Sequence, residues 1–232
     1  FVYGSESDAI VKYNQITDVS RVVVLDLKSL AGSNEYPSLE TFLNFTGKQI
    51  TGINIIDDFL FWTDGETEPK KINIKRTHHP IPSTVFGFGD HSKLMVNGVD
   101  KGFMKEGDVT VIKKKPSIAP TISFTTVKVG ASVPIFEKIF PRFCFRYKYQ
   151  DGEYSAFSPF SDVVFNPDYT GDYSQGDSFT SKESYNTAML NNIDTIIISD
   201  FVPTDIPKDV VQVDILYKQE NSNVVYSVAN IK

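Results

Sequence analysis

The 232-residue sequence contains a single cysteine and a single tryptophan, and no long apolar run. One cysteine, Cys144, excludes an internal disulfide framework of the kind that holds small secreted domains together. No segment approaches the roughly 18 consecutive apolar residues that a membrane span requires. The start at Phe1 has neither an initiator methionine nor a signal-peptide pattern. We therefore expect no membrane span, and we interpret the chain as a fragment of a longer polypeptide.

Positive charge is also scarce, because 29 acidic residues outnumber 23 lysines and arginines and leave a net charge of −6. Broad binding to nucleic-acid phosphates needs clustered Lys and Arg, so this balance argues against it. The one basic run, residues 113–115, abuts Pro116 and is interpreted as a solvated strand end or a linker.

Catalytic and metal-binding motifs are missing from the sequence. His78, His79 and His91 lie in a Gly/Pro-rich stretch without zinc-ligand spacing, and we interpret them as surface residues. Cys144 alternates with charged residues in a strand, where an inert thiol is expected. The sequence thus predicts a protein that is not an enzyme and that binds no cofactor or metal.

Two groups of aspartates are candidates for a catalytic or calcium site. Asp57 and Asp58 stand between two predicted strands, where a turn explains them without catalysis. Asp168, Asp172 and Asp177 lack the alternating oxygen spacing of a calcium loop, so their pattern does not favour a calcium site.

Alternation of apolar and polar residues predicts an all-β fold. In the first half the predicted strands are residues 9–16, 21–27, 49–56, 59–62, 71–75 and 109–113. A short helix capped by Ser38 is expected to begin near Leu39, and a hairpin is expected around Asn97-Gly98. Residues 117–120 separate two strand-rich regions, so we predict two domains, 1–119 and 120–232.

The clearest strand of the second domain begins at Arg142, and its aromatic residues share one face: Phe143, Phe145, Tyr147 and Tyr149. Asp151 and Gly152 then predict a two-residue type I′ turn. A return strand should begin at Tyr154 and break at Ser158-Pro159. Later strands are expected at residues 194–199, 210–218 and 224–228, a number and spacing that suit a small β-sandwich.

Residues 166–187 form an unusually long polar segment, and such loops tend to be functional or mobile. Tyr169, Tyr173 and Phe179 are candidate interface residues, because aromatic side chains are favoured at protein interfaces. Packing of the loop onto its own domain explains them equally well.

The stretch FLFWTDGETEPKKINI, residues 59–74, indicates a strand, a tight acidic turn and a second strand. Asp64 can accept backbone N–H bonds in the turn, Trp62 offers a large apolar surface for packing between sheets, and Pro69 belongs at the connection. With Phe61 and Thr63, these residues resemble the YWTD repeat of receptor-type β-propellers. A closed propeller needs about four to eight blades, and this motif occurs once.

A second resemblance covers nearly the whole chain and rests on four segments in order. After the Phe-Trp-Thr-Asp stretch come GDVTVIKKKPSIAP, FCFRYKYQDGEYSAFSPFS and VVQVDILYKQENSNVVYSV. This order is similar to the tail-tip muzzle or nozzle proteins of crAss-like podoviruses, relatives of the tail tubular protein B group. The resemblance implies a propeller-type blade region followed by an immunoglobulin- or fibronectin-like β-sandwich.

The same resemblance implies a structural role in the virion tail. Copies of the protein would form a ring, six-fold by the resemblance, around the channel through which the genome leaves. Partners would be other copies, neighbouring ring or fibre proteins of the tail, and genomic DNA as non-specific passing cargo. An acidic wall is compatible with sliding DNA. The alternatives are an extracellular propeller-and-sandwich adhesion or receptor-type binding module, and a tail-borne glycan hydrolase.

Overall fold

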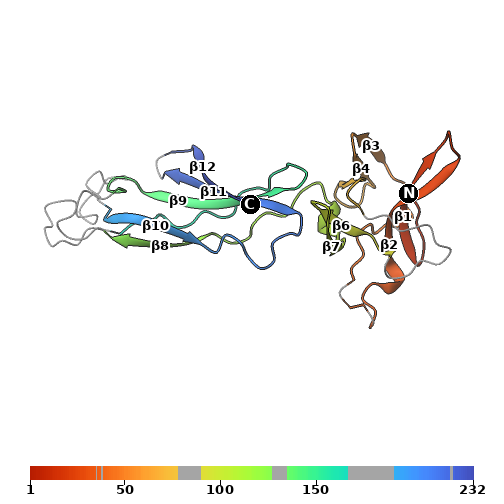
Figure 1. The fold of residues 1–232 in the computed structure, drawn as a ribbon, viewed down its shortest axis with the longest axis horizontal. Coiled ribbons are helices and arrows are strands. Elements are labelled where there is room, and N and C mark those ends of the chain that lie inside the picture. The colour runs from red at the N-terminus through yellow and green to blue at the C-terminus, as the bar shows by residue number, and fades with distance from the viewer. Residues whose placement is uncertain (35, 38, 78–89, 127–134, 167–190, 220–221) are drawn as a thin grey trace. The chain divides into compact units, whose positions relative to one another are not determined.

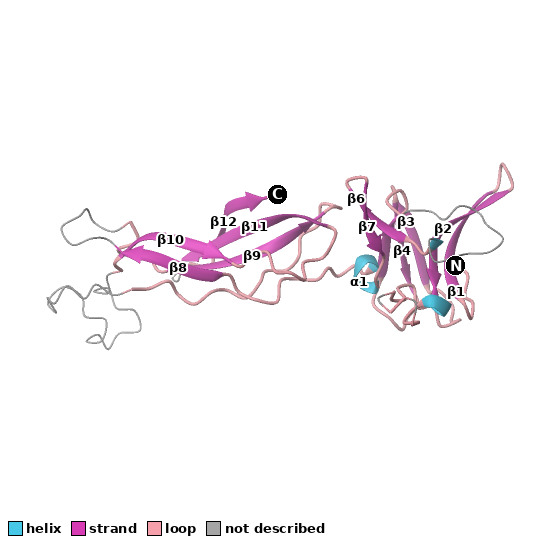
Figure 2. Cartoon of the chain, turned by 60° about the horizontal axis from the view of Figure 1, so that its bottom comes forward, coloured by secondary structure: helices cyan, strands magenta, loops and turns pink. Residues whose placement is uncertain are grey.

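The computed structural model describes the chain except for residues 35, 38, 78–89, 127–134, 167–190 and 220–221. Strands dominate the described residues, with one short α-helix and one 3₁₀ turn, so the all-β prediction is confirmed (Figure 2). The chain forms two compact units, residues 1–114 and 115–232. The sequence placed the boundary slightly later, between residues 119 and 120.

The described residues of the first unit form three small antiparallel sheets (Figure 1). One is the hairpin β1 (Ser7–Asn14) and β2 (Val19–Leu27), which runs into the 3₁₀ turn η1 (Lys28–Leu30). Another has the order β3 (Gly52–Ile56), β4 (Phe59–Thr63), β5 (Lys70–Asn73). The last pairs β6 (Lys93–Val96) with β7 (Val99–Phe103), and the helix α1 (Glu106–Val109) follows.

Local turn chemistry explains two of these hairpins. Asn97 and Gly98 have φ of 51° and 78°, the left-handed pair that a two-residue turn between β6 and β7 requires, so the predicted hairpin is confirmed. Asp57 and Asp58 form the two-residue connection between β3 and β4, as the turn interpretation expected, and Asp57 has a φ of 51°.

Two predicted elements of the first unit are wrong. Residues 39–50 contain no helix, although Leu39, Phe42 and Leu43 are buried. The backbone N–H groups of Phe42 and Leu43 bind the Asp26 carboxylate instead of helical carbonyls. The predicted strand 109–113 is also absent: α1 ends at Val109, and Thr110 makes only an isolated bridge to Lys70.

In the second unit, the part of the chain that the structure describes forms two sheets. One has the order β12 (Val225–Ile231), β11 (Val210–Gln219), β9 (Pro141–Tyr149), and the other pairs β8 (Thr121–Thr126) with β10 (Ile193–Ser199). The aromatic face of β9 is buried, as alternation predicted. Side chains of both sheets meet in common clusters, one around Phe145 and Val213 with Ile198, another around Phe143 and Ile193.

Candidate assembly site

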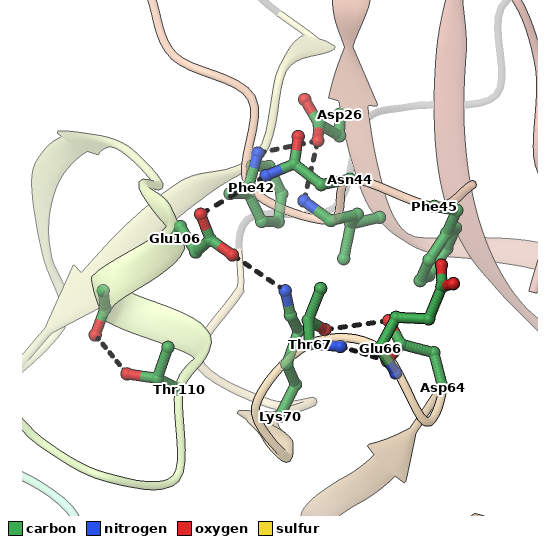
Figure 3. A network of polar contacts seen from close by, with 12 residues as sticks. Asp26, Phe42, Asn44, Phe45, Asp64, Glu66, Thr67, Lys70, Glu106 and Thr110 are labelled. Carbon is green, nitrogen blue, oxygen red and sulfur yellow. Dashed lines mark hydrogen bonds and ion pairs between the residues drawn. The ribbon is translucent and has the colours of Figure 1, made fainter. Parts of the chain in front are cut away.

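The Phe-Trp-Thr-Asp motif occupies the end of β4 and the turn after it. Asp64 Oδ1 accepts the N–H groups of Glu66 and Thr67 at 2.9 and 2.8 Å, and Oδ2 accepts the Thr67 hydroxyl (Figure 3). Slight burial raises the pKa of Asp64, but these hydrogen bonds outweigh it and hold the pKa below its usual value. Pro69 lies just before β5, where its missing N–H breaks no ladder bond.

Trp62 is only 2% exposed, and its ring lies 5.8 Å from that of Phe1. Phe61 and Thr63 alternate with it on β4 and are half-buried. The sheet that carries the motif has three strands in the described part of the chain. Its inner face is therefore built around Trp62 and Leu60, and it ends at the edge strand β3.

Two buried carboxylates face each other beside this sheet. Asp8 and Asp26 are directly paired across β1 and β2, and both are fully buried. Asp26 Oδ2 accepts N–H bonds from Phe42 and Leu43 at 2.8 Å (Figure 3). Asp8 binds the Lys28 ammonium at 2.7 Å. Desolvation raises the pKa of Asp26 above its usual value. The two N–H bonds lower this pKa and the nearby Asp8 charge raises it, and the net shift is upward. The pair anchors the 42–45 segment and requires no ligand to explain it.

The turn after β9 differs from the predicted type I′ geometry. Gly152 has a φ of 86°, but Asp151 is not among the left-handed residues. Gly152 N–H donates to the Tyr149 carbonyl, and Tyr149 N–H donates to the Glu153 carbonyl, both at 2.9 Å. This pattern is a three-residue loop, residues 150–152, that ends in a left-handed glycine. The predicted two-residue turn is therefore wrong by one residue.

Beyond the turn, the predicted return strand is replaced by a ladder of serines, which we call the serine ladder: Ser155, Ser158 and Ser161. Their N–H groups donate to the carbonyls of Tyr147, Phe145 and Phe143 at 2.8–2.9 Å. Their hydroxyl oxygens accept the N–H groups of the same three residues at 3.0 Å. Each hydroxyl thus takes the place of a strand carbonyl.

The serine ladder advances three residues for every two of β9, which is the repeat of a polyproline II helix rather than of a strand. The residues before the serines are all aromatic: Tyr154 and Phe157 are exposed, and Phe160 is half-buried. The Arg146 guanidinium lies 3.9 Å from the Tyr154 ring centroid and 6.0 Å from that of Phe157. Lys218 lies 6.0 Å from Phe160, so cations and aromatic rings interleave along the serine ladder.

Most of the remaining sequence candidates lie outside the described residues, and His91 is the exception among the histidines. Tyr169, Tyr173 and Phe179, the proposed interface residues, lie outside the described residues, as do His78, His79 and the aspartates 168, 172 and 177. His91 is fully buried, so its interpretation as a surface residue is wrong. Its Nδ1 accepts the Leu27 N–H at 3.1 Å, and burial lowers the pKa of His91 to about 4, which keeps the ring neutral in the core.

Cys144 is buried on β9, and burial raises the pKa of its thiol to about 11. Among the described residues, no three His, Cys, Asp or Glu side chains come close enough to hold a metal ion. No described helix is long and apolar enough to cross a bilayer. No family model matches the chain, and neither a curated protein nor a solved structure matches it.

Sequence reasoning predicted strands near β3 and β12 but missed that both are exposed strands at the edge of a sheet. All five residues of β3 are exposed, and no residue of β12 is buried. Large apolar side chains stand in both, among them Ile53, Ile55, Tyr226 and Val228, each more than half exposed. Alternation of residues predicted these strands. Whether a strand is covered depends on segments from distant parts of the sequence, which alternation does not describe.

Proposed function

We propose that this chain is a structural protein of the virion of a short-tailed phage, forming part of the muzzle or nozzle ring that encloses the genome-ejection channel. In this role it is not an enzyme and works through shape and contacts between copies. The tail assignment rests on the ordered resemblance of its four segments to crAss-like podovirus tail proteins. Its partners would be further copies and adjoining ring or fibre proteins of the tail.

The single observation that carries the assembly role is the pair of exposed apolar edge strands. An edge presents unpaired N–H and C=O groups, and monomeric proteins usually blunt it with charges, proline or a covering element. Residues 52–56 of β3 contain three isoleucines and none of these devices, and β12 has a bulge between its pairs to Ile215 and Leu216 but no proline or internal charge. Such edges suit a protein that pairs with neighbours.

We also propose a β-sandwich for the second unit and a propeller-type blade for the first. Two sheets with shared clusters and the strand order β12-β11-β9 support an immunoglobulin- or fibronectin-like sandwich for residues 120–232. A blade of a propeller has four strands, whereas the sheet around Trp62 has three among the described residues. A propeller-type blade within 1–119 therefore requires a further strand at one of the two edges of this sheet, β3 or β5.

The net charge of −6 supports the conduit role in one respect. A wall of negative charge repels phosphate and lets DNA pass as cargo without binding it. Arg146, beside the serine ladder, is not free to bind DNA phosphate. Its guanidinium is already paired with Asp214 at 3.1 Å and stacked on the Tyr154 ring.

The proposal is tested by electron microscopy of the purified chain together with its mass in solution over a wide concentration range. We expect closed rings with a central channel. A discrete monomer at every concentration would refute the ring. In that case a glycan-array screen would test the alternative adhesion or receptor-type module, and glycan turnover would test the hydrolase.

A further inference from the structure

The inner face of the β3-β4-β5 sheet is unfinished at β3. Residues directly opposite one another on paired strands share a face. Ile53 pairs with Trp62, and Ile55 pairs with Leu60. The two β4 residues are 2% and 5% exposed, whereas Ile53 and Ile55 are 58% and 62% exposed. These isoleucines therefore extend the core face of the sheet beyond the side chains that cover it.

The inner face of the β12-β11-β9 sheet is unfinished in the same way. Val213 and Ile215 of β11 are buried in the core of the second unit. Their partners on β12, Ile231 and Ala229, are exposed, and so is Tyr226 opposite Tyr217. In the part of the chain that the structure describes, β12 pairs only with β11 and β3 pairs only with β4.

The two edges are complementary in charge. Residues 49–58, around β3, carry two aspartates and no lysine or arginine. Residues 222–232, around β12, carry one lysine and no acidic residue. Asp57 and Asp58 follow the end of β3, and Lys232 follows the end of β12, so a parallel arrangement of the two strands brings opposite charges together. Asp58 also contacts Lys75, but both side chains are exposed and that pair is weak.

We propose that β3 of one copy pairs in parallel with β12 of a second copy, joining their sheets edge to edge. This inference rests on the proposed ring of copies and specifies which surfaces form it. After its bulge β12 alternates regularly, so one register places Ile53 and Ile55 on the same face as Ala229 and Ile231, and the four side chains form a shared apolar strip. The joined sheet then has six strands, three from each copy.

The contact joins two different surfaces and is therefore heterologous. Heterologous contacts between identical copies close into a ring when the rotation per copy allows it, and otherwise make an open filament. One strand pair buries less than the roughly 1,200 Å² of a stable isolated interface, so each contact is weak by itself. When a ring closes, its last contact forms within one assembly, so every copy is then held by two contacts and the whole ring is stabilised.

The first test changes the edges without touching the cores. Ile53→Lys with Ile55→Lys, and separately Tyr226→Lys with Val228→Lys, place charges on edges that are exposed in the single copy. Each pair should raise the apparent Kd of assembly at least about tenfold while thermal melting stays unchanged. Ile16→Lys is the matched control, because Ile16 is 96% exposed and lies in the β1–β2 turn.

The second test fixes the orientation with one engineered thiol per copy. An Ile55→Cys copy is mixed with an Ile231→Cys copy or with a Val225→Cys copy, and a short bismaleimide links them. Cys144 is buried and does not compete. Parallel pairing predicts linkage of Ile55→Cys to Ile231→Cys well above that to Val225→Cys, since six strand residues separate these positions by about 20 Å.

The outcomes separate the inference from the proposed function. Rings that persist in both lysine variants overturn the edge pairing and leave the ring standing. Linkage that favours Val225→Cys overturns the parallel arrangement and its charge argument. A wild-type chain that stays monomeric at all concentrations overturns the ring and the pairing together.

Discussion

Replacing Ser158 with alanine removes a hydroxyl that acts as a backbone acceptor. Ser158 Oγ accepts the Phe145 N–H at 3.0 Å and donates to the Pro159 carbonyl at 2.9 Å. Phe145 is fully buried, so its N–H finds no water when the hydroxyl is gone. A buried donor left without a partner costs about 1–3 kcal/mol. The bond from Ser158 N–H to the Phe145 carbonyl remains, so the segment stays in place.

Hydrogen exchange with mass spectrometry measures this effect locally, which matters because the two units need not unfold together. If the ladder amides exchange through unfolding of the second unit, a loss of about 1–3 kcal/mol speeds the exchange of residues 143–147 roughly 5- to 150-fold. Ser123→Ala is the control, since Ser123 is exposed on β8 of the same unit and its loss should change stability by less than about 0.5 kcal/mol. Equal exchange in the two variants would refute the role of the serine hydroxyl as a strand acceptor.

Three further predictions concern single buried groups. Trp62→Ala should destabilise the first unit by about 3–5 kcal/mol, measured by circular dichroism, and a melting curve that does not shift would contradict the blade interpretation. The pKa of Asp26 is raised on folding, so the stability that its protonation contributes is complete below pH 3.8 and is lost as the pH rises through the folded pKa. Asp26→Asn keeps an oxygen acceptor without the charge and should make urea midpoints of the first unit less dependent on pH above 3.8; an unaltered pH profile would argue against a raised pKa. Cys144 should resist alkylation at pH 8 until the second unit unfolds, because its thiol titrates near pH 11; rapid labelling of the native chain would show that it is accessible.

The strands were predictable because alternation is a local property. Residues 21–27 and 59–62 lie within observed strands, and the aromatic face of β9 is buried as its period of two indicated. The helix near Leu39 failed because its spacing suits two environments. Leu39, Phe42 and Leu43 reach the core either from a helix or from an extended segment held by Asp26, and Asp26 lies in a different part of the sequence.

The serine ladder marks the limit of local reasoning more clearly. A serine every third residue between aromatic residues is visible in YSAFSPFS, but its meaning depends on β9 lying alongside with its N–H groups free to donate. Proline at 159 predicted a break in the strand, and the structure shows the pairing continuing through hydroxyl groups. The spacing of three residues between these serines is the sequence feature that could have predicted the serine ladder. A search for period-two alternation alone does not detect it.

The sequence by itself determined that the chain is all-β, roughly where most strands lie, and which face of β9 is apolar, because these depend on residues next to one another. The tertiary structure alone decided that Asp8 faces Asp26, that His91 is buried, and that Ile53 and Ile55 continue a core face but stay more than half exposed. Burial depends on which distant strands cover a side chain, and strand pairing brings together residues far apart in the chain. The exposed edges therefore could not be read from their own residues.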